Sequence, residues 1–392
     1  MQYRKFGKLD FEVSTLGFGA MRLPTKEGHV DEPEATRMLS YAIEHGVNYV
    51  DTAYGYHDGQ SELWLGKALK NHDRETVKLA TKLPSWLVKE ATDFDKYFNE
   101  QLKRLQTDHI DFYLLHTLNA KFWPNLHKLG VLEWAENAIK EGRIGYLGFS
   151  FHDKYPVFEE IVNAYDWTFC QIQHNYMDIE NQAGTKGLKL AASKGLAVVI
   201  MEPLLGGRLV NPPQPIQALW DTAEKKRTAT DWALQWLWNQ PEVSVVLSGM
   251  SAMEHVQENV AYADVSGIKT LTAKELILFD QVREKYQGLS PIPCTTCGYC
   301  LPCPNGVNIP RNFGVYNQGM MYDKPAWARA EYVWMETAYK RGMDPQDQRA
   351  IACTQCQVCE EKCPQNIPIS QWMPVVNEVL GEGKPYRKSL LS

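Results

Sequence analysis

The chain lacks any apolar run long enough to span a membrane, and it lacks an excess of positive charge. Of its 392 residues, 47 are acidic and 41 are lysine or arginine, which gives a net charge of −6. A negative balance disfavours nucleic acid or an anionic membrane as the main partner. Residues 1–7 also lack the apolar core of a signal peptide. We therefore expect a cytoplasmic protein with no membrane or nucleic-acid partner.

Cysteine is almost absent from the first 290 residues, where Cys170 stands alone in an apolar run and is expected to be a small buried residue. The other eight cysteines come later in the chain. In an intracellular protein, such clustering indicates metal or iron–sulfur ligation rather than a disulfide framework. The change in character predicts two domains, 1–285 and 286–392, lengths that suit a large barrel and a small appendage.

The glycine fingerprint of an open dinucleotide-binding sheet, Gly-x-Gly-x-x-Gly, does not follow the first predicted strand. Instead, short β-branched and aromatic runs alternate with segments of helical apolar spacing. This alternation predicts a (β/α)8 TIM barrel, an α/β fold, preceded by a small hairpin in residues 3–13. The predicted strands are 15–19, 48–51, 77–82, 111–116, 144–150, 169–173, 197–201 and 244–248. Clear predicted helices are 32–44, 95–105, 131–140 and 188–194.

The late cysteines form two runs, each closed by Cys-Pro: Cys294-x2-Cys297-x2-Cys300-x2-Cys303 and Cys353-x2-Cys356-x2-Cys359-x3-Cys363. Three thiolates at this spacing can wrap one face of a [4Fe–4S] cubane, and in two-cluster ferredoxins the fourth cysteine ligates the other cluster. Zinc on Cys-x2-Cys pairs is the alternative. We predict a mainly helical, ferredoxin-like domain with two clusters. One would be held by Cys294, Cys297, Cys300 and Cys363, and the other by Cys353, Cys356, Cys359 and Cys303.

Polar side chains stand at the ends of three consecutive predicted barrel strands. Asp51 ends the second strand and is followed by Tyr56, Lys82 ends the third, and His116 ends the fourth. The carboxyl ends of barrel strands are where such folds carry their chemistry. Singly, Asp51 could be a helix cap, Lys82 a surface charge and His116 a core histidine. Their occurrence in consecutive order favours a shared site.

These segments, Asp51-Thr-Ala-Tyr-Gly-Tyr56, Leu79-Ala-Thr-Lys82 and Phe112-Tyr-Leu-Leu-His116, resemble the aldo-keto reductase superfamily, and the resemblance runs from about residue 1 to 285. The tail resembles the ferredoxin-like domain attached to some bacterial and archaeal members. The resemblance implies that Tyr56 donates a proton and that His116 orients a substrate carbonyl. A phenol is a weak acid until a cation stabilises its anion, which Lys82 could do while Asp51 holds it. Tyr54 is the nearest competitor of Tyr56.

The resemblance also implies where a nicotinamide cofactor would lie. It assigns Ser150 and Gln171 to the carboxamide and Met201 to the nicotinamide ring. Backbone N–H groups near the pyrophosphate would come from Gly206, Gly207, Gly249 and Ser251. The adenine end would be met by Glu258 and Asn259. This chain departs from many members in having Phe151-His152 after the serine, where an asparagine is common.

Cofactor preference follows from charge. NADP-preferring members often place a lysine and an arginine at the 2′-phosphate, and here those positions look like Ser248 and His255. Loss of two cations favours NADH or a relaxed preference for NAD(P)(H), although Arg208 could compensate.

The expected activity is that of an oxidoreductase that interconverts a small-molecule carbonyl and alcohol by hydride transfer. The clusters would relay electrons to a redox protein partner such as a ferredoxin or flavoprotein. Two alternatives stay open. The barrel could have lost nicotinamide turnover and serve as an electron-transfer or docking module, or the clusters could be purely structural.

Overall fold

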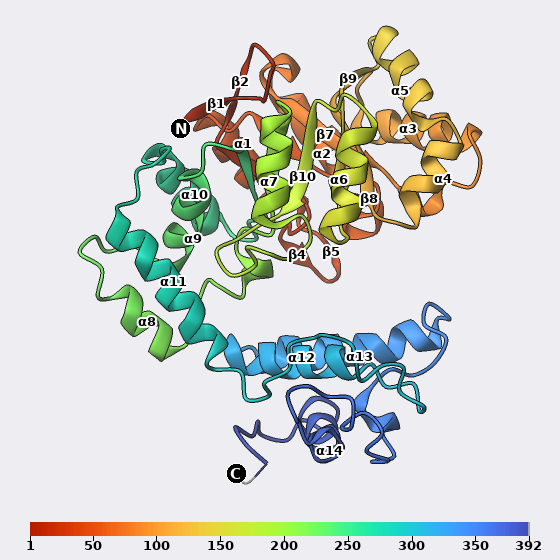
Figure 1. The fold of residues 1–392 in the computed structure, drawn as a ribbon. Helices are drawn as coiled ribbons and strands as arrows, with labels where there is room; N and C mark the ends of the chain where they lie inside the picture. Colours follow the sequence, from red (N-terminus) through yellow and green to blue (C-terminus); the bar gives the residue numbers. More distant parts are fainter. Residues whose placement is uncertain (391–392) are drawn as a thin grey trace. The chain divides into compact units, whose positions relative to one another are not determined.

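The computed structural model describes residues 1–390, and the chain divides into two compact units (Figure 1). The first unit contains residues 1–206 and 230–272, and the second contains residues 207–229 and those from 273 onward. The segment 207–229 and the helix that begins at Ala273 therefore group with the second unit. The predicted division at 285/286 remains a prediction of domain organisation.

The first unit is built on a closed barrel of eight parallel strands. Around the barrel the order is β3 (Leu16–Gly19), β6 (Tyr49–Asp51), β7 (Lys78–Leu83), β8 (Ile110–Leu118), β9 (Ile144–Phe151), β10 (Phe169–Gln173), β11 (Ala197–Met201) and β12 (Val243–Ser248). β12 pairs with β3 and closes the ring, Val246 lying beside Leu16. All eight predicted strands are present, and the TIM-barrel prediction is confirmed.

Helices lie between the strands and surround the barrel (Figure 1). The first begins where Asp31 accepts a hydrogen bond from the Glu34 N–H at 3.3 Å, with Pro33 in the first turn, two features that favour a helix start. The helices are α1 (Glu32–Glu44), α2 (Gln60–Ala68), α3 (Thr92–Leu105), α4 (Phe122–Lys128), α5 (Val131–Lys140), α6 (Tyr155–Ala164), α7 (Gly184–Ser193), α9 (Ala229–Trp238) and α10 (Met253–Asp264).

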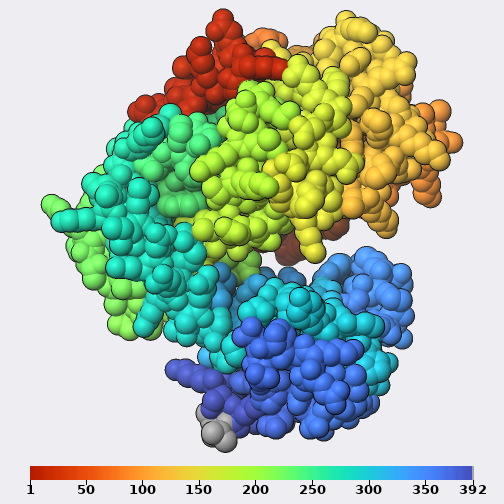
Figure 2. All heavy atoms as spheres, viewed as in Figure 1, coloured from red at the N-terminus to blue at the C-terminus, as the bar shows by residue number. Residues whose placement is uncertain are grey.

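The N-terminal hairpin, β1 (Tyr3–Lys5) with β2 (Glu12–Ser14), closes the end of the barrel where the strands begin. Its Phe6 is fully buried, and the ring lies 4.5 Å from that of Phe112 inside the barrel. Gly7 has φ +59°, and a Cβ there would come within 2.5 Å of the Ala197 nitrogen, so glycine is required. The hairpin residues, red at the surface in Figure 2, pack on this end of the barrel, which leaves the opposite end for a site.

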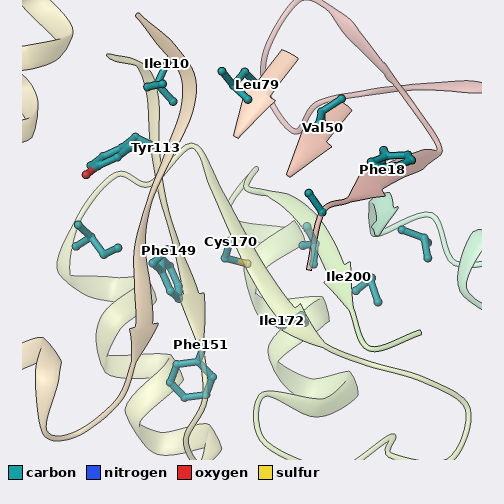
Figure 3. Close-up of a cluster of buried hydrophobic side chains, with 14 of the residues drawn as sticks. Phe18, Val50, Leu79, Ile110, Tyr113, Phe149, Phe151, Cys170, Ile172 and Ile200 are labelled. Atoms are coloured by element: carbon teal, nitrogen blue, oxygen red, sulfur yellow. The ribbon is translucent and has the colours of Figure 1, made fainter. Parts of the chain in front are cut away.

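The outward faces of the strands pack against the helices in a continuous apolar cluster, part of which is shown in Figure 3. Phe149, Phe151 and Ile172 belong to it. Cys170 lies in the same cluster with no solvent exposure, and burial raises the pKa of its thiol. The prediction of Cys170 as a small buried residue is therefore confirmed.

The second unit is mainly helical, as predicted. It contains α8 (Gln214–Trp220), α11 (Ala273–Gln287), α12 (Ile309–Met321), α13 (Pro325–Lys340) and α14 (Ile369–Leu380). Its apolar core includes Phe313, Tyr332 and Met373. Across residues 1–390, none of the helices combines the length and apolarity needed to cross a bilayer.

Candidate active site and cysteine sites

The four residues of the predicted catalytic set converge at the carboxyl ends of β6, β7 and β8. Lys82 Nζ donates to Asp51 Oδ1 at 2.6 Å and to the Thr52 carbonyl at 2.7 Å. The same ammonium donates to the Tyr56 hydroxyl at 3.3 Å. The rings of Tyr56 and His116 meet edge to face, with centroids 6.0 Å apart. The structure thus brings together all four side chains from positions 51 to 116.

Burial and charge together set the ionisation of the pair at the centre of this site. Lys82 is fully buried and Asp51 is 2% exposed. Burial opposes the ammonium, yet the negative charge of Asp51 and the hydrogen bonds to Asp51 and Tyr56 outweigh it and raise the pKa of Lys82. Burial raises the pKa of Asp51, and Lys82 opposes that rise. Lys82 therefore remains a cation, held in one place by Asp51.

The Tyr56 phenol keeps its proton in the ligand-free site. Burial raises the pKa of Tyr56 and is a larger effect than the lowering by Lys82. Lys82 therefore lowers the pKa of Tyr56, as the sequence analysis expects, but desolvation raises that pKa by more. A protonated phenol beside an ammonium is a proton donor whose anion would be stabilised at the moment it forms.

His116 is a neutral imidazole. Burial, followed by the charges of Lys82 and His152, lowers its pKa well below the ordinary value. Its Nδ1 is buried and has no hydrogen-bond partner among residues 1–390. The exposed Trp86 lies beside it, with ring centroids 5.1 Å apart. A neutral imidazole can hydrogen bond to a substrate oxygen without adding a charge to the site.

Tyr54, the competitor of Tyr56, is directed elsewhere. Its hydroxyl donates to Glu100 Oε2 at 3.0 Å. The Arg104 guanidinium lies 4.0 Å above its ring and donates to its carbonyl oxygen at 3.1 Å. Only Tyr56 presents its hydroxyl to Lys82.

A buried polar network that the sequence analysis did not identify contacts β7, the strand that ends near Lys82. Glu62 is fully buried and accepts hydrogen bonds from Thr81 at 2.6 Å, Gln101 at 2.7 Å and Arg104 at 3.2 Å. Gln101 also donates to the Lys82 carbonyl at 3.0 Å. Burial raises the pKa of Glu62, and its partners oppose the rise. In the sequence, the signal that could have indicated this network was the pair of polar residues Gln101 and Arg104 near the end of the predicted helix 95–105.

The residues predicted at the carboxamide also lie together. Ser150 on β9 is directly opposite Gln171 on β10 in the sheet register, and both are buried. Ser150 Oγ accepts a hydrogen bond from the Thr117 N–H at 2.8 Å, whereas Gln171 Oε1 has no partner among the described residues. A buried, unpaired amide oxygen is suited to the N–H₂ of a carboxamide. Met201 ends β11, the next strand.

The remaining first-unit cofactor positions lie in the loop after β11 and in the stretch that runs from the end of β12 into α10. Gly206 and Gly249 are both exposed. The exposed Ser251 directs its N–H toward His255 Nδ1 at 3.4 Å, so the predicted phosphate donor already has a protein partner. Ser248 is buried and accepts a hydrogen bond from Asn259 at 2.9 Å, and Glu258 is exposed on α10.

Gly207 and Arg208 fall in the second unit. The Arg208 guanidinium donates to Gln318 and lies 4.4 Å above the ring of Trp327. Their predicted roles at the cofactor stay predictions.

The cysteines of the second unit line two cavities. One is lined by Cys294, Cys297, Cys300 and Cys363, and the other by Cys303, Cys353, Cys356 and Cys359. The fourth cysteine of each run therefore lies with the three of the other run, as in two-cluster ferredoxins. In residues 1–390, no three acidic, histidine or cysteine side chains converge on a single-ion site. Four cysteines around a cavity suit a cubane, in which each iron takes one thiolate.

Comparison with known proteins agrees with both units. The profile described as the aldo/keto reductase family matches residues 15–283, and that of the 4Fe-4S dicluster domain matches residues 293–367. The first match covers more than half of the sequence. The chain therefore belongs to the aldo/keto reductase family, and it is an oxidoreductase that carries a C-terminal 4Fe-4S dicluster domain.

The alignments with similar proteins cover most of the length of those proteins. An uncharacterised oxidoreductase of Bacillus subtilis, YqkF, is 28% identical, the alignment covering 70% of this chain and 94% of YqkF. The NADH-specific methylglyoxal reductase of Escherichia coli is 27% identical, covering 66% and 93%. Among solved structures, the holo form of aldo-keto reductase AKR11C1 from Bacillus halodurans is 28% identical, with a TM-score of 0.61, covering 72% of this chain and 96% of that one.

Proposed function

We propose that the barrel interconverts a small-molecule carbonyl and alcohol by reversible hydride transfer with a nicotinamide cofactor, and that Tyr56 passes the proton. The carrying observation is the position of Lys82 Nζ, between Asp51 Oδ1 at 2.6 Å and the Tyr56 hydroxyl at 3.3 Å. Family membership and the unpaired Gln171 amide oxygen support the cofactor class.

The chain's own residues supply the proton and the orientation, and a bound nicotinamide would supply or accept the hydride. In the reducing direction, Tyr56 donates its proton to the carbonyl oxygen as hydride reaches the carbon. Lys82 stabilises the phenolate that results, and Asp51 keeps Lys82 in position. His116, being neutral, orients the carbonyl oxygen through a hydrogen bond.

We further propose two [4Fe–4S] clusters in the second unit, with the crossed ligand sets predicted from the sequence, in a protein of the cytoplasm. The two four-cysteine cavities support this assignment. The clusters would exchange electrons with a redox protein partner such as a ferredoxin or flavoprotein. A hydride carries two electrons whereas each cluster transfers one, so direct coupling would require a component that divides the pair.

Cofactor preference is proposed to be NADH or relaxed. At the two positions where a lysine and an arginine would grip a 2′-phosphate, this chain has Ser248 and His255, neither of which is a lysine or an arginine. Phe151, which stands where an asparagine is common, packs against Phe158 with ring centroids 5.1 Å apart and contributes to the core. The carboxamide would therefore be held by Ser150 and Gln171.

The proposal is tested by anaerobic titration of the full-length protein with NADH and NADPH, followed by carbonyl-dependent oxidation of the bound cofactor. We expect Tyr56→Phe to bind cofactor normally and to lose at least about 100-fold in kcat, because the proton donor is gone. Tyr54→Phe is the matched control and should keep most activity. Absence of binding by the wild type would contradict the proposal and favour the docking-module alternative.

A further inference from the structure

Arg22, on the loop after β3, extends across two glycines at the carboxyl end of the barrel. Its Cγ lies 2.9 Å from the position that a Cβ would take at Gly249, and its Nη2 lies 3.6 Å from the corresponding position at Gly206. Gly206 follows β11 and Gly249 follows β12. One exposed arginine therefore spans the loops after two neighbouring strands. A side chain at Gly249 would collide with the Arg22 Cγ, so glycine at position 249 allows Arg22 to lie there.

The guanidinium has no hydrogen bond or ion pair with any protein group in residues 1–390. It lies beside exposed glycine backbone, and the nearby Ser251 N–H is directed to His255. A free guanidinium offers a fork of N–H donors that matches an oxyanion. The chemistry of this place is therefore that of an anion site, with Arg22 as its charge.

The loop that carries Arg22 is tied to the segment that carries the proton donor. The Leu23 N–H donates to His57 Nε2 at 3.2 Å, and Ser61 Oγ donates to the Ala20 carbonyl at 3.0 Å. His57 itself has φ +51°, a conformation that needs support from its surroundings. These bonds tie the backbone on either side of Arg22 to the segment that carries Tyr56.

We propose that Arg22 binds the pyrophosphate of the nicotinamide dinucleotide. The inference rests on the proposed function and adds a residue that the sequence analysis did not assign. Gly206 and Gly249, which Arg22 spans, follow β11 and β12. Met201, predicted at the nicotinamide ring, ends β11, and Asn259, predicted at the adenine end, lies on α10 after β12. The pyrophosphate is the part of the dinucleotide midway between these ends, and it is common to NADH and NADPH.

The experiment is isothermal titration calorimetry on the full-length protein with its clusters, kept anaerobic, using NADH, NADPH and ADP-ribose. ADP-ribose contains the pyrophosphate but lacks the nicotinamide, so it reports binding without turnover. We expect Arg22→Gln to weaken all three about tenfold, since one charge-assisted contact is lost. Arg22→Lys should lose less, because it keeps the charge. Lys26→Gln, an equal change of charge at an exposed position of the short strand β4 (Thr25–Lys26), four residues further along the chain, should change affinity less than about twofold.

Three results would overturn the inference. Equal affinity of Arg22→Gln and wild type for all three ligands would exclude a contact while leaving the proposed function intact. A loss confined to NADPH would place Arg22 at the 2′-phosphate instead. Absence of binding by the wild type would overturn the proposed function together with this inference.

Discussion

At the scale of single residues, burial decides which groups of the site are charged. The pKa of Lys82 is raised and that of His116 is lowered well below its ordinary value, so the site holds one cation and a neutral imidazole. Tyr56 retains its proton because desolvation raises its pKa. Near neutral pH the resting site therefore suits the proposed reducing direction, with the proton already on Tyr56.

The neutral state of His116 predicts a pH dependence of stability. In the unfolded chain its pKa returns to about 6.5, so below that pH the unfolded state binds more protons and stability falls as pH falls. When the pH is lowered from about 7.5 to about 5.5, the free energy of unfolding should fall by about 1 kcal/mol less in His116→Gln than in the wild type. Urea unfolding followed by tryptophan fluorescence measures this. The variant His29→Gln, at an exposed histidine, is the control. An equal fall in the free energy of unfolding in the wild type, His116→Gln and His29→Gln would contradict the prediction.

Residue identity alone left Tyr54 and Tyr56 as competitors, and geometry separates them. The Tyr54 hydroxyl is held by Glu100, whereas that of Tyr56 lies 3.3 Å from the Lys82 ammonium. Both tyrosines stand in the same short loop, so their sequence surroundings hardly differ. What distinguishes them is α3, which supplies Glu100 and Arg104 from another part of the chain.

At the scale of elements, α3 holds the loop that carries Tyr54 and Tyr56 to the barrel. Arg104 on this helix donates to Glu62 on α2 and to the Tyr54 carbonyl, two residues before Tyr56. Gln101, one helical turn earlier, donates to the carbonyl of Lys82. The helix thus contacts both segments that carry the pair Tyr56 and Lys82, to which we assign proton transfer.

Removing the Arg104 charge should destabilise the protein and lower kcat. Arg104→Met leaves the buried Glu62 without its cation, at an expected cost of about 2 kcal/mol because the arginine is partly exposed. Glu62→Gln combined with Arg104→Met should recover about 1 kcal/mol, since the uncompensated charge is gone. Urea unfolding and steady-state kinetics measure the two effects. Lys103→Met, an exposed neighbour on α3, is the control, and an identical response of both single variants would refute this role.

At the scale of the whole molecule, the two cysteine runs depend on each other. Each cavity takes three cysteines from one run and the fourth from the other. Ile309 and Ile369, which begin α12 and α14, line both cavities. Each complete set of four cysteines therefore requires the runs to meet, although some 50 residues separate them in the sequence.

Crossed ligation predicts an unusual pattern of cluster loss. Cys294→Ala with Cys363→Ala removes two ligands from one cavity, so iron should fall from about eight to about four atoms per chain. Cys353→Ala with Cys363→Ala affects both cavities and should lose nearly all iron. Iron analysis and electron paramagnetic resonance of the reduced protein measure this. The reverse pattern would show that each run holds its own cluster.

Much of the fold could be predicted from the sequence because each barrel strand is marked by the residues of its own short run. The run 169–173 and the run 197–201 were predicted with the bounds that the structure has for β10 and β11. Buried parallel strands are continuous apolar runs, a signal carried by neighbouring residues. The grouping of segment 207–229 with the second unit was not predicted, because it depends on contacts with residues after 273.

The sequence by itself determined the barrel, the hairpin, the two cysteine runs and the identities of the four site residues Asp51, Tyr56, Lys82 and His116, because each is a pattern of local spacing or composition. Only the tertiary structure decided which tyrosine faces Lys82, that Glu62 and Arg104 support it, and that Arg22 lies across Gly206 and Gly249. The physical reason is that hydrogen bonds and desolvation act between groups that folding brings within a few ångströms, whatever their separation along the chain.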